Sequence, residues 1–201
     1  ASADAAPPPP ARAPGAYATR DKLWIYCQFD GLDAHEEAWS KTAAYRLLNE
    51  TSLGSVLETV GVPLLERLVA WLPNRKINGE EAVTIIKHLA RKGFVLTSNA
   101  DPGAPDGTRL VVVLRQAVTK DAKPVFGRLI GSIMHPSAKP KLERKEGRVL
   151  VVVPPAEGED EAKTPGWVWW ADGEDLVIGL SHPGAADAVL ATLDGKLPSV
   201  E

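Results

Sequence analysis

The side chains that could carry out chemistry are few and widely separated in this sequence. Its four histidines stand at positions 35, 88, 135 and 182, and no two of them have the spacing of a metal site. The single cysteine, Cys27, excludes an internal disulfide and a multi-cysteine metal centre. The glycine-rich nucleotide motifs and the zinc-protease, esterase and EF-hand motifs do not occur. The sequence therefore predicts no metal site, no cofactor and no catalytic residues.

Two local patterns have a chemical and a structural interpretation. Ser181 and His182 could form a nucleophile–base pair, but adjacent residues do not place the hydroxyl against the imidazole, so we expect a cap on the last helix. A run of acids could bind calcium, but it lacks the alternating spacing of a calcium loop, which predicts a solvated loop. The run consists of Glu157, Glu159, Asp160 and Glu161. We therefore expect a protein that is not an enzyme.

A tryptophan cluster, WVWW at 167–170, is the best candidate for ligand binding. Gly173-Glu174 suits a two-residue hairpin turn between Asp172 and Asp175, which pairs Trp170 with Val177. Alternation then puts Trp167 and Trp169 on one face, which we expect to be core, and Trp170 on the other. Trp170 either packs beneath a loop or helix or stays exposed. It is the only ligand-binding candidate that the sequence offers.

Composition limits the partners. Lys and Arg number 23 against 26 Asp and Glu, giving a net charge of −3, which argues against a nucleic-acid binder. No apolar run reaches the roughly 18 residues of a membrane span, so we expect a soluble chain. Residues 1–18 are dominated by Ala and Pro and predict a disordered tail, followed by a single domain over 19–201.

Hydrophobic periodicity predicts an α+β fold: a mainly antiparallel sheet, helices packed on one face, and a helical block directly after the first strand. The first strand covers 22–29 and should bury Cys27. Capping-box patterns at Asp33/Glu36 and Asn78/Glu81 predict two helix starts. Between them we expect two further helices, the second beginning near Pro63.

Two segments resemble a group of uncharacterised exported bacterial α+β proteins. The first is KLWIYCQFDGLDAHEEAWSKTAAYRLLNE, which contains a strand and an EAW-K-T helix (Glu37, Ala38, Trp39, Lys41, Thr42), and which ends on Leu47, Leu48 and Asn49. The second is WVWWADGEDLVIGLSHPGAADAVLATLDG, a strand–turn–strand–helix unit. The resemblance implies export to the periplasm or beyond; cytoplasmic residence is the alternative. Because members of the group are longer, it also implies that this chain is the N-terminal portion of a larger protein.

Together these features predict a non-enzymatic exported or envelope-associated module with a scaffolding or partner-binding role. The partner would be a protein or a glycan. The first alternative is a carbohydrate or small-ligand binder that uses an exposed tryptophan, Trp170. The second is a hydrolase whose residues meet only in space.

Overall fold

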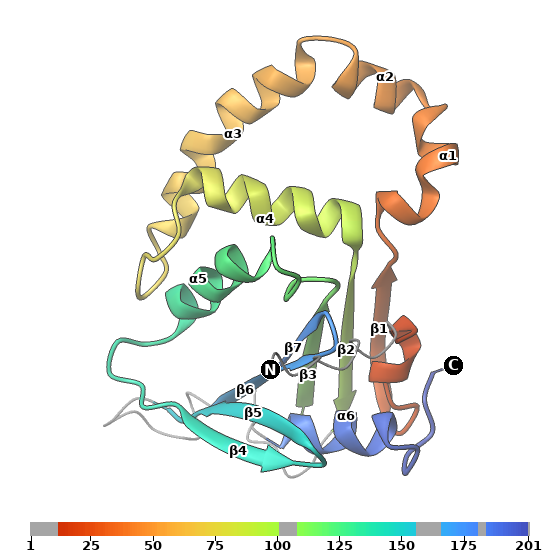
Figure 1. Ribbon diagram of the computed structural model, residues 1–201, viewed down its shortest axis with the longest axis vertical. Helices are drawn as coiled ribbons and strands as arrows, with labels where there is room; N and C mark the ends of the chain where they lie inside the picture. Colours follow the sequence, from red (N-terminus) through yellow and green to blue (C-terminus); the bar gives the residue numbers. More distant parts are fainter. Residues whose placement is uncertain (1–11, 101–107, 156–165, 181–183, 201) are drawn as a thin grey trace, which may run out of the picture.

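A computed structural model describes residues 12–100, 108–155, 166–180 and 184–200. Its centre is a seven-stranded sheet in the order β1-β2-β3-β7-β6-β5-β4, and every neighbouring pair is antiparallel (Figure 1). The strands are β1 (Leu23–Phe29), β2 (Phe94–Ala100), β3 (Thr108–Leu114), β4 (Lys141–Lys145), β5 (Arg148–Val153), β6 (Trp167–Asp172) and β7 (Asp175–Leu180). The expected α+β fold with an antiparallel sheet is confirmed.

Six α-helices and two short 3-10 helices accompany the sheet in the described residues. They are η1 (Pro14–Tyr17), η2 (Leu32–His35), α1 (Glu36–Ser40), α2 (Ala43–Asn49), α3 (Leu53–Val69), α4 (Gly79–Lys92), α5 (Lys123–Ile133) and α6 (Ala185–Leu193). The predicted capping box at the start of α4 is present, with the Asn78 side chain accepting from the amide of Glu81 and the Glu81 carboxylate accepting from the amide of Asn78. The second predicted box is wrong: η2 is capped by Gly31, and Asp33 pairs with Arg91 and Lys92 instead.

The sheet carries a hydrophobic cluster on each face. One cluster joins Trp170, Val113 and Val177 to α6 through Val189 and Leu190. The other joins the opposite sides of β3 and β7 to α4 and α5, around Phe126 and Ile130. Helices therefore lie on both faces, and the expectation that they cover one face is wrong.

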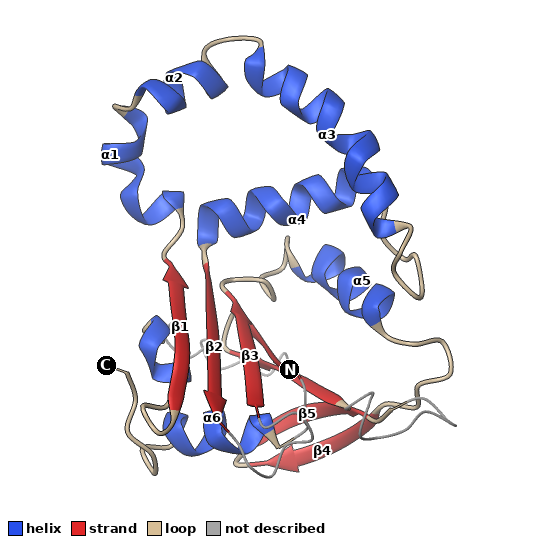
Figure 2. Ribbon diagram, turned by 180° about the vertical axis from the view of Figure 1, so that it is seen from behind, coloured by secondary structure: helices blue, strands red, loops and turns tan. Residues whose placement is uncertain are grey.

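The helical block between β1 and β2 forms an arch (Figure 1; Figure 2 shows it from behind). The chain leaves β1, runs through α1, α2 and α3, and returns along α4, which packs on α3 and α5. No residue of α1 or α2 is buried, and α3 buries only Val69. One helix replaces the two that the sequence predicted here, because Pro63 lies inside α3 instead of beginning a new helix.

The predicted tail ends earlier than residue 18. Residues 1–11 lie outside the described part of the chain, but η1 packs against α6 and Tyr17 is buried at 1% exposure. The Tyr17 ring enters the cluster beneath α6, which composition alone did not reveal. Cys27 also differs from expectation: it is exposed, because β1 is an edge strand whose outer part no described helix covers.

Candidate interaction surface on helix α3

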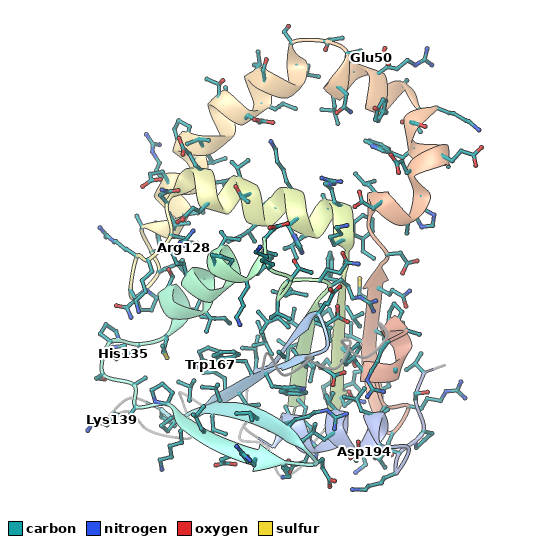
Figure 3. All side chains as sticks on the ribbon, viewed as in Figure 1. Glu50, Arg128, His135, Lys139, Trp167 and Asp194 are labelled. Atoms are coloured by element: carbon teal, nitrogen blue, oxygen red, sulfur yellow. The ribbon has the colours of Figure 1, made fainter. Side chains whose placement is uncertain are left out.

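Trp170, the ligand-binding candidate of the sequence, is completely buried. The predicted hairpin register is confirmed, with Asp172 opposite Asp175 and Trp170 opposite Val177. Trp170 packs beneath a helix, α6, which is the first of the two placements expected for it. Trp167 and Trp169 pack against the core cluster of the other face as expected, but they are only partly buried (Trp167 is labelled in Figure 3). Trp170 therefore supports the core and offers no surface to a ligand.

Gly179 is the feature of the sequence that could have predicted the burial of Trp170, and the sequence analysis did not use it. A Cβ at Gly179 would lie 3.1 Å from the Cβ of Ala185 and 2.9 Å from Val168 Cγ1. A glycine within a strand marks a place where another chain segment approaches closely. The glycine and the alanines at the start of α6 thus let the helix settle directly on the face of Trp170.

The histidines described by the structure lie apart and have separate roles. The Nε2 atom of His88 lies 2.9 Å from the carbonyl oxygen of Arg115, and its ring meets Phe126 edge-on. His135 follows α5 (Figure 3) and forms a hydrogen bond with Ser137. His35 is an exposed residue 3.9 Å from Asp30. His182, Ser181 and the acidic run 157–161 lie outside the described residues. Within the described ranges no three His, Cys, Asp or Glu side chains gather as a metal site would require.

Buried charges gather at the β6–β7 turn. Asp172 accepts from Arg148 Nε at 3.0 Å and from Arg12 Nε at 2.8 Å, and Asp175 lies 3.4 Å from Arg115 Nε. The Tyr17 hydroxyl lies between these two carboxylates and is the hydrogen-bond donor to both. Burial, reinforced by the negative charges of the two aspartates, raises the pKa of this phenol above its ordinary value. The carboxylates are matched by cations, so the cluster ties the N-terminal segment to the sheet.

A cavity of about 430 Å³ lies beside the C-terminal end of α4, and the Asp33 carboxylate in it is ion-paired. Phe29 and Phe94 form its apolar wall, and Asp33 lies 2.9 Å from Lys92 Nζ and 3.1 Å from Arg91 Nε. Hydrogen bonds from these two cations lower the pKa of the Asp33 carboxyl. An acid held ionised by two partners is a poor general acid or base near neutral pH.

The outward surface of α3 is the most unusual feature of the described residues. Six large apolar side chains on this helix and the turn after it are 51% to 88% exposed. They are Val56, Leu57, Val60, Leu64, Leu68 and Trp71, and we call them the α3 stripe. A contiguous exposed apolar patch of this kind marks an interaction site in most folded proteins.

The polar residues of α3 explain why its apolar side faces outward. Glu58 forms an ion pair with Lys87 of α4 at 2.5 Å, and Glu66 accepts a hydrogen bond from the amide of Gly79 at the start of α4. Leu65 and the buried Val69 repeat on this same side at helical spacing. Both carboxylates of the helix are thus turned toward α4, and the opposite side keeps the α3 stripe.

One charge lies within the α3 stripe. Arg67 falls on the outward side between Leu64 and Trp71, and it forms no ion pair with any described residue. The sequence analysis did not predict the stripe, because it divided this segment into two helices at Pro63. Reading 53–71 as one helix would have shown two apolar sides, which one neighbouring helix cannot cover.

No described helix is long and apolar enough to cross a membrane. In comparisons with known proteins, no family model, curated protein or solved structure matches this chain.

Proposed function

We propose that this chain is a non-enzymatic module that holds a protein partner on the α3 stripe. The observation that carries the proposal is the outward side of α3, where six large apolar side chains are each more than half exposed. Leaving such side chains in water forgoes roughly 1 kcal/mol each, about half of the value for full burial. An apolar partner surface would recover that free energy.

The two alternative functions have less support from the described residues. A glycan or small-ligand binder would use Trp170, and that ring is buried under α6. A hydrolase would need convergent reactive groups in a cavity, whereas the Asp33 carboxylate in the cavity beside α4 is held in ion pairs with Arg91 and Lys92. The partner-binding proposal therefore rests on an exposed surface, and the alternatives have no comparable feature.

We further propose that the module acts in the cell envelope. The Ala/Pro-rich residues 1–11 and the resemblance to exported α+β proteins support this location. Fractionation of cells that express the full natural protein tests it: periplasmic or envelope fractions should hold the protein, and recovery with cytoplasmic markers would refute the location without touching the binding proposal.

A photo-crosslinking amino acid at Val60 tests the binding function in cells. Val60 is 65% exposed in the α3 stripe, while the control position Thr59 is exposed on the same helix outside the stripe. We expect a discrete protein adduct from position 60 and none from position 59. The adduct partner, once identified and purified, should bind the chain and lose affinity for V60E but not for T59E. Equal labelling at both positions would contradict the proposal.

A further inference from the structure

We infer that the partner on the α3 stripe is α3 of a second copy of this chain, packed antiparallel about a two-fold axis. The inference rests on the proposed function, because it identifies the occupant of the same surface. Isologous two-fold dimers are the commonest assemblies of folded proteins, and they need a surface that is complementary to itself.

The first argument is the spacing along α3. Leu53, Leu57, Val60, Leu64, Arg67 and Trp71 follow one another at intervals of four, three, four, three and four residues. This alternation is the a/d pattern of a coiled-coil seam, in which two helices meet along a narrow apolar line. A helix that packs on a broad core shows a wider apolar face. Four members of the α3 stripe lie on this line, Val56 and Leu68 flank it, and the half-buried Leu53 and the exposed Arg67 complete it. This line is the feature that fits one facing helix.

The second argument is the symmetry of this seam. The positions are mirrored about residue 62, so an antiparallel helix places Leu53 opposite Trp71 of the second copy and Val60 opposite Leu64 of the second copy. Trp71, the largest side chain of the seam, then meets Leu53 at its far end, and the two central pairs, each of Val60 with Leu64, are apolar. Each a position faces a d position, as in antiparallel helix pairs.

The third argument is Arg67, which sets the direction. In a parallel pair the two Arg67 side chains would share one layer, and like charges would repel. In the antiparallel pair they lie about ten residues apart along the seam, or about 15 Å at 1.5 Å per residue. A polar residue in a seam is a known device that fixes alignment at a cost in affinity.

The charges of the arch favour a protein over a lipid surface. Residues 36–75 carry five carboxylates and four cations, a net charge of −1. Anionic membranes recruit segments in which Lys and Arg outnumber Asp and Glu, and in this segment they do not. A second copy, in contrast, brings the same near-neutral surface.

The size of the surface predicts a weak dimer. A stable interface takes about 800 Å² from each partner, and six large side chains that are more than half exposed approach this area. Burial of this area has to offset the translational and rotational freedom that two copies lose on association, so we expect a dissociation constant on the order of 10 µM.

Analytical ultracentrifugation of the purified full chain, from ~1 to ~200 µM, tests the pairing. Wild type should pass from monomer to dimer, V60E should stay monomeric, and T59E should behave like wild type. R67L should dimerise at least fivefold more tightly, because it removes the charge from the seam. All four proteins should have the same far-UV spectrum, since the substituted side chains are exposed. A wild type that stays monomeric over the whole range overturns the inference, and so does a dimer that V60E leaves intact.

Engineered cysteines test the direction. In a C27S background, oxidation of mixed L53C and W71C proteins should give the mixed disulfide, while either protein alone should give little. An L53C homodimer would show a parallel pair and overturn the antiparallel arrangement. If the chain stayed monomeric and bound vesicles through Val60, both the protein-partner function and the second copy would be overturned. A monomeric chain whose Val60 crosslinks a different protein in cells would overturn the second copy alone and leave the proposed function standing.

Discussion

The Tyr17 hydroxyl lies 3.0 Å from Asp175 Oδ2, and this buried contact fastens the start of the chain to the β6–β7 turn 158 residues later. The same hydroxyl lies 3.2 Å from Asp172. The neutral phenol is the form that two neighbouring carboxylates require, because a phenolate would repel both. The N-terminal segment is therefore part of the folded unit from Arg12 onward.

Tyr17→Phe should lower the free energy of unfolding by about 1–3 kcal/mol near pH 7, because two buried carboxylates lose a donor. The raised pKa of Tyr17 adds a pH dependence. Above about pH 10 the unfolded state releases the phenolic proton while the folded state retains it, so wild type loses stability as the pH rises through this range. Urea unfolding at pH 8 to 11 should show a steeper decline for wild type than for Y17F. Tyr45→Phe on α2 is the control, and a decline identical in wild type and Y17F would contradict the assignment.

Trp170→Ala should destabilise the protein by about 3–5 kcal/mol, because it empties the centre of the cluster beneath α6. Trp170→Phe should cost clearly less, since the indole N–H has no hydrogen-bond partner among the described residues. Trp169→Ala, on the partly exposed face, should lie below Trp170→Ala. Acrylamide quenching of single-tryptophan variants should rank Trp71 as most accessible and Trp170 as least. A Trp170 quenched as readily as Trp169 would be incompatible with burial under α6.

Local patterns predicted those parts of the fold that depend on near neighbours. The Gly-Glu turn fixed the β6–β7 register, and Asn78 with Glu81 marked the start of α4. The predictions failed where burial or ion pairing depends on an element that is distant in the sequence. The depth at which Trp170 is buried in the hairpin depends on α6. The ion pairs of Asp33 depend on two cations from the end of α4.

The candidate site was missed for a related reason. Pro63 lies inside α3 on an exposed position, so the proline that predicted a helix start does not mark a boundary here. The number of helices available to cover α3 cannot be derived from local patterns, and only the packed structure shows that α4 covers one side of it. Trp71, for which the sequence analysis made no prediction, is 88% exposed.

Leu64→Ala should change the free energy of unfolding of the monomer by less than about 1 kcal/mol, because Leu64 is 59% exposed and contributes little to the core. Val69→Ala, on the buried side of the same helix, should cost about 2 kcal/mol. Thermal or urea unfolding at ~1 µM, below the expected dimer range, separates these effects from association. A larger loss for Leu64 than for Val69 would mean that the α3 stripe faces the interior.

Gly93→Ala should be strongly destabilising, by more than about 2 kcal/mol. Gly93 has φ of 87°, and a Cβ there would lie 2.0 Å from the carbonyl oxygen of Phe29. Gly147→Ala is the matched control: its φ is also positive at 74°, but no atom lies within 4 Å of its Cβ position. This control should cost only about 1 kcal/mol, the strain of the left-handed conformation. Equal losses in the two variants would show that the close contact with Phe29 has no energetic effect.

The arch is an insertion into what would otherwise be a simple hairpin. Phe29 pairs with Phe94, so the two strands meet end to end as hairpin strands do, yet the turn between them is a helical excursion of more than sixty residues. Closing so long a loop carries an entropic penalty that a two-residue turn avoids. We therefore expect β1 to join the sheet late in folding, after α4 has packed on α5. In a nascent chain, β1 would stay unpaired while β2, β3 and β7 assemble, so β1 would be synthesised before these three strands and join the sheet after them.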